Sequence, residues 1–296
     1  MIDEQVFSND RGTTAAYIDD GDSDDGDNDR DEDTDPVDVY LTLSEGESDN
    51  GSAYSLPPHQ RCACHTLNLI ATTDAAKAET DAVYNKTYRS TFAKCQTLWN
   101  RYGCSSLAVD AVTDAYGVGL KRPNSTRWNS VFHAVDRHVR LVNDKGDDEF
   151  RKLCVKLDVP KFTPAEKEFL EDYAVAMKPV TQALNILQSE AKMYMGYLLP
   201  TICILREKLV SLQTTRSSCL PLVAAVLAGI DDRFAPIFGD KDAIAAAILH
   251  PQFRNTWTDN EAMVDSGIRH IRSLLQSSVS LEQTQSSSGQ STANNL

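Results

Sequence analysis

Long apolar runs are missing from this 296-residue sequence, and none approaches the ~20 residues that a membrane-spanning helix requires. The first ten residues are polar and do not resemble a secretory signal peptide. The seven cysteines are odd in number and follow no regular spacing, which argues against a disulfide framework and suits a reducing compartment. The composition therefore predicts an intracellular protein without a membrane segment.

A second pair of closely spaced metal ligands is missing too. Cys62 and His65 lie three residues apart, but a structural zinc site needs four ligands, usually from two such pairs. The cysteines and histidines outside this run occur singly, at His59, Cys95, Cys104, His133, His138, Cys154, Cys203, Cys219, His250 and His270. The sequence therefore predicts no metal and no cofactor. By residue chemistry alone, Cys62 and His65 are either a buried thiol beside a core histidine or a functional pair.

The acidity of the chain is confined to one end. Residues 1–56 hold 18 Asp and Glu against 2 Lys and Arg, whereas residues 57–296 hold 25 acidic and 27 basic side chains. The net charge of -14 thus belongs to a tail, and the rest of the chain is near neutral. A near-neutral body neither identifies a DNA-binding surface nor excludes one, because phosphate affinity depends on local clusters of Lys and Arg.

Both ends of the chain are predicted to be disordered. Residues 1–56 are acidic, and Asp19–Asp35 within them is mostly Asp with Gly, Ser and Asn, so the segment buries too little apolar surface to offset its ordering entropy. Within it, Val37–Leu43 alternates as a strand does, and is either a short edge strand or an unpaired apolar patch. Residues 277–296, rich in Ser, Gln, Thr and Asn, form the second disordered segment.

Between these ends the apolar residues recur at threes and fours, which predicts helices. The expected helices cover about 79–102, 107–116, 128–142, 164–187, 198–213, 220–234, 241–249 and 260–276. Thr163, Pro164 and Glu166 form a capping-box pattern with proline at the first helical position. Lys121 and Arg122 fall in a glycine-containing loop and are predicted to be exposed.

The acidic segment ends before residues 61–75, where apolar residues able to form a core first recur. A short extended run, Gln60 to Cys64, precedes a helical pattern led by Leu67 and Ile70. This pattern predicts a junction between the end of a strand and a helix, which is a common position for functional side chains.

Three runs occur in order along the chain: Cys62-x-x-His65-x-Leu67-Asn68-Leu69, then Ser125-Thr126-Arg127-Trp128-Asn129-Ser130, then Ala247-Ile248-Leu249-His250-Pro251-Gln252-Phe253-Arg254. Together they resemble the motifs of hAT-family transposases and their domesticated, BED-zinc-finger relatives. The resemblance covers residues 56–260 or so. It implies a mainly α fold, in which a truncated ribonuclease-H-like core remnant (57–78) precedes an all-helical insertion domain (79–276). The strand expected before Cys62 would then have lost its sheet, leaving an open edge that a protein partner could cover.

The resemblance also bears on catalysis. The family is thought to cut DNA with two metal ions held by three carboxylates, all of which are needed. Asp49 has the sequence context of the second carboxylate, but it lies in an acidic loop only 13 residues before Cys62 and follows no apolar strand. Glu261 and Glu282 lack the pattern that surrounds the third. We therefore expect no catalytic residues and no enzyme activity.

Two functions are compatible with these observations. In the family that the chain resembles, the Arg-Trp pair of the second motif lies close to the transposon end. The predicted DNA-binding residues are Cys62, His65, Lys121, Arg122, Arg127 and Trp128, in a nuclear, catalytically inactive hAT-type transposase-like fragment. By residue chemistry alone, Trp128 would be a core residue and Arg127 would be solvated. The alternative is a helical protein–protein interaction module, with an acidic tail that recruits basic partners and no nucleic-acid role.

Overall fold

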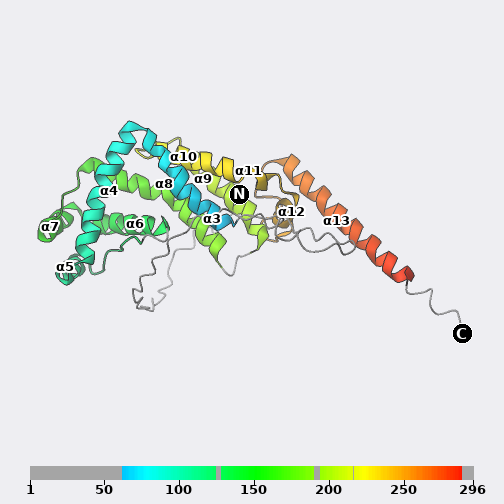
Figure 1. Cartoon of the computed structure of the whole chain (residues 1–296), viewed down its shortest axis with the longest axis horizontal. Coiled ribbons are helices and arrows are strands. Elements are labelled where there is room, and N and C mark those ends of the chain that lie inside the picture. The colour runs from blue at the N-terminus through cyan, green and yellow to red at the C-terminus, as the bar shows by residue number, and fades with distance from the viewer. Residues whose placement is uncertain (1–61, 125–127, 190–193, 216, 289–296) are drawn as a thin grey trace, which may run out of the picture. The chain divides into compact units, whose positions relative to one another are not determined.

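The structure, a computed structural model, describes residues 62–124, 128–189, 194–215 and 217–288 (Figure 1). Side chains are described throughout these ranges except for Trp128 and residues 278–288. The described residues all belong to one compact unit of the chain. The predicted acidic tail of residues 1–56, with its strand-like run Val37–Leu43, lies outside them.

Every regular element in these ranges is helical, and none has the combined length and apolar character that a membrane span requires. The elements are α3 (Ala63–Leu69), a π-helical turn η1 (Ile70–Asp74), a 3-10 turn η2 (Ala75–Thr80), α4 (Ala82–Gly103), α5 (Ser106–Tyr116), α6 (Trp128–Lys145), α7 (Asp147–Leu157), α8 (Pro164–Gln188), a 3-10 turn η4 (Met195–Tyr197), α9 (Leu198–Leu212), α10 (Leu220–Arg233), α11 (Ala235–Phe238), α12 (Lys241–Leu249) and α13 (Glu261–Ser288). The prediction of a mainly α fold is confirmed.

Helix α8 is the centre of the core. Its start is the predicted capping box, in which Thr163 Oγ1 accepts a hydrogen bond from the Glu166 N–H at 3.3 Å, and Glu166 Oε2 accepts one from the Thr163 N–H at 2.7 Å. The predicted apolar stripe is buried at Phe169, Tyr173, Met177, Val180 and Leu184. Helices α3, α4, α6 and α9 pack against this helix (Figure 1).

Helix α7 was not predicted. Gly146, at φ +88°, ends α6 after Lys145, and a new helix begins at the next residue. Three acidic side chains in its first turn, Asp147, Asp148 and Glu149, interact favourably with the positive end of the helix dipole. The helix buries Phe150, Leu153, Cys154 and Leu157, so tertiary packing stabilises an element too short to be stable alone.

The extended run predicted from Gln60 to Cys64 was wrong for Ala63 and Cys64. Cys62 has extended backbone angles, but α3 begins at Ala63, because Leu67 and Ile70 are spaced to bury one helical face. The described part of the expected ribonuclease-H-like remnant, residues 62–78, is helical from Ala63 onward, and α10 packs against its η1 and η2 turns. The described residues therefore offer no sheet edge for a partner to cover.

The disorder predicted from residue 277 was also wrong up to Ser288. Helix α13 was expected to end near Gln276, but it continues to Ser288. The sequence has no glycine or proline between Ser277 and Ser288, so nothing local forces the helix to stop before Gly289. Ser277 Oγ donates to the Ser273 carbonyl at 3.0 Å within this stretch.

Candidate functional site

Cys62 and His65 lie at the start of α3, and both are exposed. Their exposure contradicts the interpretation of the pair as a buried thiol beside a core histidine. Burial and the neighbouring Cys62 raise the pKa of the Cys64 thiol, which disfavours the thiolate that a metal would need. Among the described residues, no three His, Cys, Asp or Glu side chains lie close enough to hold a metal ion.

We expect the purified protein to contain no stoichiometric zinc. Cys62, Cys64 and His65 can supply at most three ligands from one short run, where a structural zinc site uses four. Elemental analysis of the full chain measures this. One zinc per chain, lost on changing Cys62→Ser, would contradict the expectation.

The predicted basic residues have separate environments. Lys121 and Arg122 are exposed in the loop after α5, as predicted. Arg122 lies across the end of α4, since a Cβ atom added at Gly103 would overlap its guanidinium group. A cation at this place interacts favourably with the negative, carboxy-terminal end of the α4 dipole. Arg127 and the side chain of Trp128 lie outside the described residues, although Trp128 begins helix α6.

Positive charge is concentrated around the second motif. Residues 117–143 contain five Lys and Arg and one Asp, whereas residues 57–296 as a whole exceed neutrality by only two charges. Burial lowers the pKa of His133, and the charges of Lys121 and Arg140 lower it further against the opposing effect of Asp136. Lys121 therefore lies near the second turn of α6. We call residues 117–143 the basic segment.

The third motif has a packing role. His250 and Phe253 contact each other and Tyr197, with ring centroids 4.7 to 5.1 Å apart. Tyr197 also donates its hydroxyl to Gln252 Oε1 at 3.0 Å. These contacts join the turn after α12 to η4. In this place the motif stabilises the carboxy-terminal helices.

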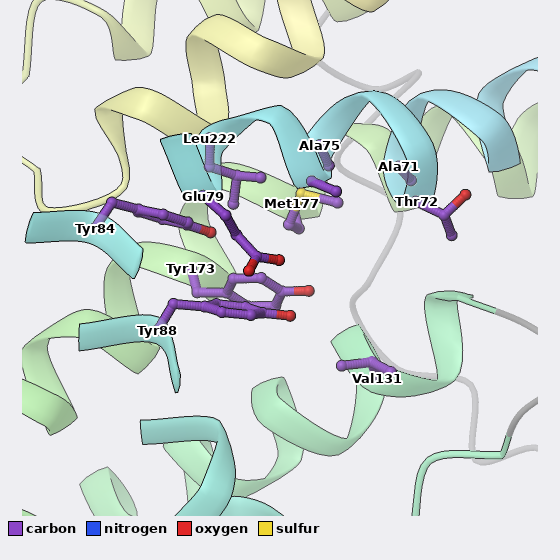
Figure 2. Close-up of a pocket in the computed structure, with 11 residues that line it drawn as sticks. Ala71, Thr72, Ala75, Glu79, Tyr84, Tyr88, Val131, Tyr173, Met177 and Leu222 are labelled. Carbon is purple, nitrogen blue, oxygen red and sulfur yellow. The ribbon is translucent and has the colours of Figure 1, made fainter. Parts of the chain in front are cut away.

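The structure places one cavity beside the first two motifs. It has a volume of about 220 Å³ and is lined by η1, η2, α4, α8, α10 and the first turn of α6 (Figure 2). Ala71 and Thr72 continue the helical path that begins at Ala63, next to Cys62, and Val131 directly follows the Arg-Trp motif. Cys62, His65, Lys121 and Arg122 do not line this cavity. The predicted site residues are therefore not gathered in it.

The polar groups of the cavity are three tyrosines and one glutamate, with Thr72 at the other end of the lining. Tyr84 and Tyr88 come from α4, Tyr173 from α8 and Glu79 from η2 (Figure 2). The rings of Tyr84 and Tyr88 are stacked, with centroids 5.7 Å apart. Figure 2 shows the tyrosine hydroxyls and the Glu79 carboxylate close together, with Val131 on the other side of the opening.

Ionisation of these tyrosines is suppressed. Burial raises the pKa of Tyr84, Tyr88 and Tyr173 above the usual phenol value, and in Tyr88 the charge of Glu79 adds to the effect. The hydroxyls are therefore neutral at physiological pH. Each can donate one hydrogen bond and accept others.

Sequence reasoning missed this cavity. Tyr84, Tyr88 and Tyr173 occur at helical spacing among the apolar residues of two predicted helices, and their rings do pack in or against the core. Their hydroxyls also reach the cavity. The sequence indicated the cavity only weakly. Glu79 precedes Tyr84 and Tyr88 by about one helical turn or two, but Tyr173 lies 85 residues after Tyr88 on another helix.

No protein-family model, curated protein or solved structure matches this chain.

Proposed function

We propose that the chain is a catalytically inactive, hAT-type transposase-like fragment that contacts DNA through its basic segment. The order of the three motifs supports the ancestry, and the charge of the basic segment supports the contact. The ancestry includes a ribonuclease-H-like origin for residues 57–78 and a nuclear location. Those two parts of the proposal rest on the motifs alone.

The observation that carries the DNA contact is the local charge. Five basic side chains against one acidic side chain lie in 27 consecutive residues, and they surround the motif that resembles the DNA-proximal motif of the family. Lys121 is exposed and makes no ion pair among the described residues. Arg140 pairs with Asp136 at 3.0 Å, but 60% of its side chain remains exposed. Exposed cations that attract phosphate release bound counterions, which favours association at low salt.

We expect Lys121→Ala to weaken binding of a hairpin or single-stranded DNA by roughly threefold to tenfold at ~50 mM salt, on the order of 1 kcal/mol for the removal of one cation from a phosphate. The slope of log affinity against log salt should also become shallower by about 0.7 to 0.9 for each phosphate that the variant no longer neutralises. A fluorescence-anisotropy titration at several salt concentrations measures both quantities.

The matched control is Lys241→Ala, which removes an exposed lysine at the start of α12, outside the basic segment. It should leave the slope unchanged. Equal effects of the two substitutions would mean that binding follows net charge alone and would contradict a site at the basic segment. No binding at ~50 mM salt would leave the interaction-module alternative.

The alternative, a helical protein–protein interaction module, is favoured by a different observation. The cavity beside Glu79 is lined by no lysine, arginine or histidine, so it suits a cationic group better than a phosphate. A basic protein segment supplies such a group.

A further inference from the structure

The cavity beside Glu79 presents tyrosine hydroxyls that no other described protein group binds. Tyr84 is 4% exposed and Tyr173 is 8% exposed, and neither hydroxyl has a hydrogen-bond partner among the described residues, although both oxygens remain accessible to solvent. The hydroxyls reach the cavity from the same side as the Glu79 carboxylate (Figure 2). We propose that this cavity binds an alkylammonium group, with the ammonium held by Glu79 and the tyrosine hydroxyls. This proposal is independent of the DNA contact.

The charge of the cavity selects a cation. The Glu79 carboxylate makes no ion pair among the described residues, because the nearby Lys77 instead contacts Asp74 at 2.9 Å. The lining includes no other charged side chain. A bound cation would therefore meet one unpaired negative charge and no competing positive charge. An anion would be repelled.

The hydroxyls match the hydrogen-bonding needs of an ammonium. An alkylammonium has three N–H donors and no acceptor, while a carboxylate and neutral phenols supply acceptor oxygens. Tyr84 and Tyr88 come from α4 and Tyr173 from α8, so their hydroxyls reach the cavity from two different helices (Figure 2). In binding, the N–H donors of the ammonium would replace the water that these accessible hydroxyls otherwise contact.

The size and apolar lining of the cavity suit a short alkyl chain. Met177, Leu222 and Val131 supply apolar surface, and Ala71 and Ala75 leave the space open. A volume of about 220 Å³ is equivalent to roughly seven water-sized atoms at ~30 Å³ each. A four- or five-carbon alkylammonium has five or six heavy atoms. The side chain of lysine beyond Cα is of the same size and chemistry.

The proposal is tested with n-pentylammonium on the full chain carrying ¹³C-labelled methionine methyl groups. Met177 lines the cavity and Met263 lies in α13, so the second methyl is an internal control. We expect the Met177 signal to shift and saturate with a Kd of ~1 mM, a reasonable value for a ligand of this size, while Met263 does not move. n-Pentanol and pentanoate should shift Met177 at least tenfold more weakly.

Two variants measure how much the Glu79 charge and the tyrosine hydroxyls contribute to binding. Glu79→Gln keeps the shape of the side chain and the backbone carbonyl that accepts from Asn85 Nδ2 at 2.9 Å, and it should weaken binding at least tenfold. Tyr173→Phe removes one hydroxyl while keeping the ring, and should weaken binding about threefold or more. Glu168→Gln, an exposed glutamate on α8, is the matched control and should bind as the wild type does.

A second pair of probes distinguishes the two possible sources of the ammonium group, a protein side chain and a small molecule. A lysine-containing peptide with neutral flanking residues represents a protein partner, and 1,5-diaminopentane represents a free diamine. Tighter binding of the peptide supports a protein partner, whereas tighter binding of the diamine supports a small-molecule ligand; either result requires Glu79. An unmoved Met177 signal at ~20 mM n-pentylammonium, or an equal response to n-pentanol, would overturn the proposal.

Discussion

Replacing Glu166 by alanine should lower the free energy of unfolding by ~2 to 4 kcal/mol, because the change removes the cap of α8 and several hydrogen bonds to a buried carboxylate. Glu166 is 6% exposed and begins α8. Its carboxylate accepts hydrogen bonds from Lys94 Nζ at 2.6 Å, Ser90 Oγ at 2.6 Å and the Thr163 N–H at 2.7 Å. One side chain thus caps α8 and joins it to α4, so its loss removes both contributions.

The same group makes the stability depend on pH. Burial alone would raise the pKa of Glu166, but the hydrogen bonds from Lys94, Ser90 and Thr163 outweigh it and lower the pKa to about 2 from the ordinary 4.5. A carboxyl whose pKa falls on folding stabilises the native state fully above the unfolded-state pKa, and this stabilisation is lost as the pH falls toward the folded-state pKa. The difference between wild type and Glu166→Gln should therefore be constant from pH 7 to about 5 and shrink below about 4.5.

Chemical denaturation at several pH values measures both effects. Glu168→Ala is the matched control, since Glu168 is exposed on the same helix two residues further on. It should change the free energy of unfolding by less than ~0.5 kcal/mol at every pH. A loss of under ~1 kcal/mol on Glu166→Ala would show that solvent already satisfies Lys94 and Ser90, contrary to the geometry.

Much of the helical fold could be predicted because local signals determine it. The capping box at Thr163 and the four-three spacing of the stripe in α8 specify that helix without reference to the rest of the chain. Asp240 caps α12 through its side chain, and α12 has the predicted bounds. Propensity and periodicity agree in these elements, which is why sequence reasoning succeeds there.

The predictions for α7, for the start of α3 and for the cavity failed because tertiary contacts determine these features. Helix α7 forms because Phe150 and Leu153 are buried in the core. Ala63 and Cys64, predicted to end an extended run, instead begin α3 because Leu67 and Ile70 are buried. The cavity beside Glu79 joins side chains from six elements, so no local pattern could have indicated it. The predicted basic loop at Lys121 was easier to recognise, since exposure of charged residues after a helix-ending glycine is a local property.

Arg233→Ala should be the other severe substitution, with a cost of ~3 to 5 kcal/mol. Arg233 Nε donates to Asp74 Oδ2 at 2.5 Å, across 159 residues of sequence. The Asp74 side chain is only 4% exposed, and it lies in the π-helical turn η1 against Gly229, where a Cβ atom would come within 2.8 Å of Oδ2. Burial raises the pKa of Asp74, but Arg233 and Lys77 outweigh that effect and the net pKa is lowered.

The two partners of this pair should not be equivalent. Arg233→Ala leaves a buried carboxylate with only Lys77 to neutralise it, whereas Asp74→Ala leaves an arginine whose side chain is already 23% exposed and can turn to water. We therefore expect Asp74→Ala to cost less, ~1 to 3 kcal/mol. The asymmetry follows from burial, because the desolvation penalty falls on whichever charge cannot leave.

A second arginine–aspartate pair provides the control for this prediction. Arg206 contacts Asp231 at 2.7 Å between α9 and α10, but the two side chains are 47% and 50% exposed. Arg206→Ala should cost only ~0 to 1 kcal/mol, since water replaces the missing partner. Thermal and urea denaturation of the three variants measure the ranking. If Arg233→Ala were as mild as Arg206→Ala, the Asp74 carboxylate would have to take up a proton or reach solvent in the variant. In that case the free energy of unfolding of Arg233→Ala would no longer decrease as the pH is lowered, whereas that of the wild type does.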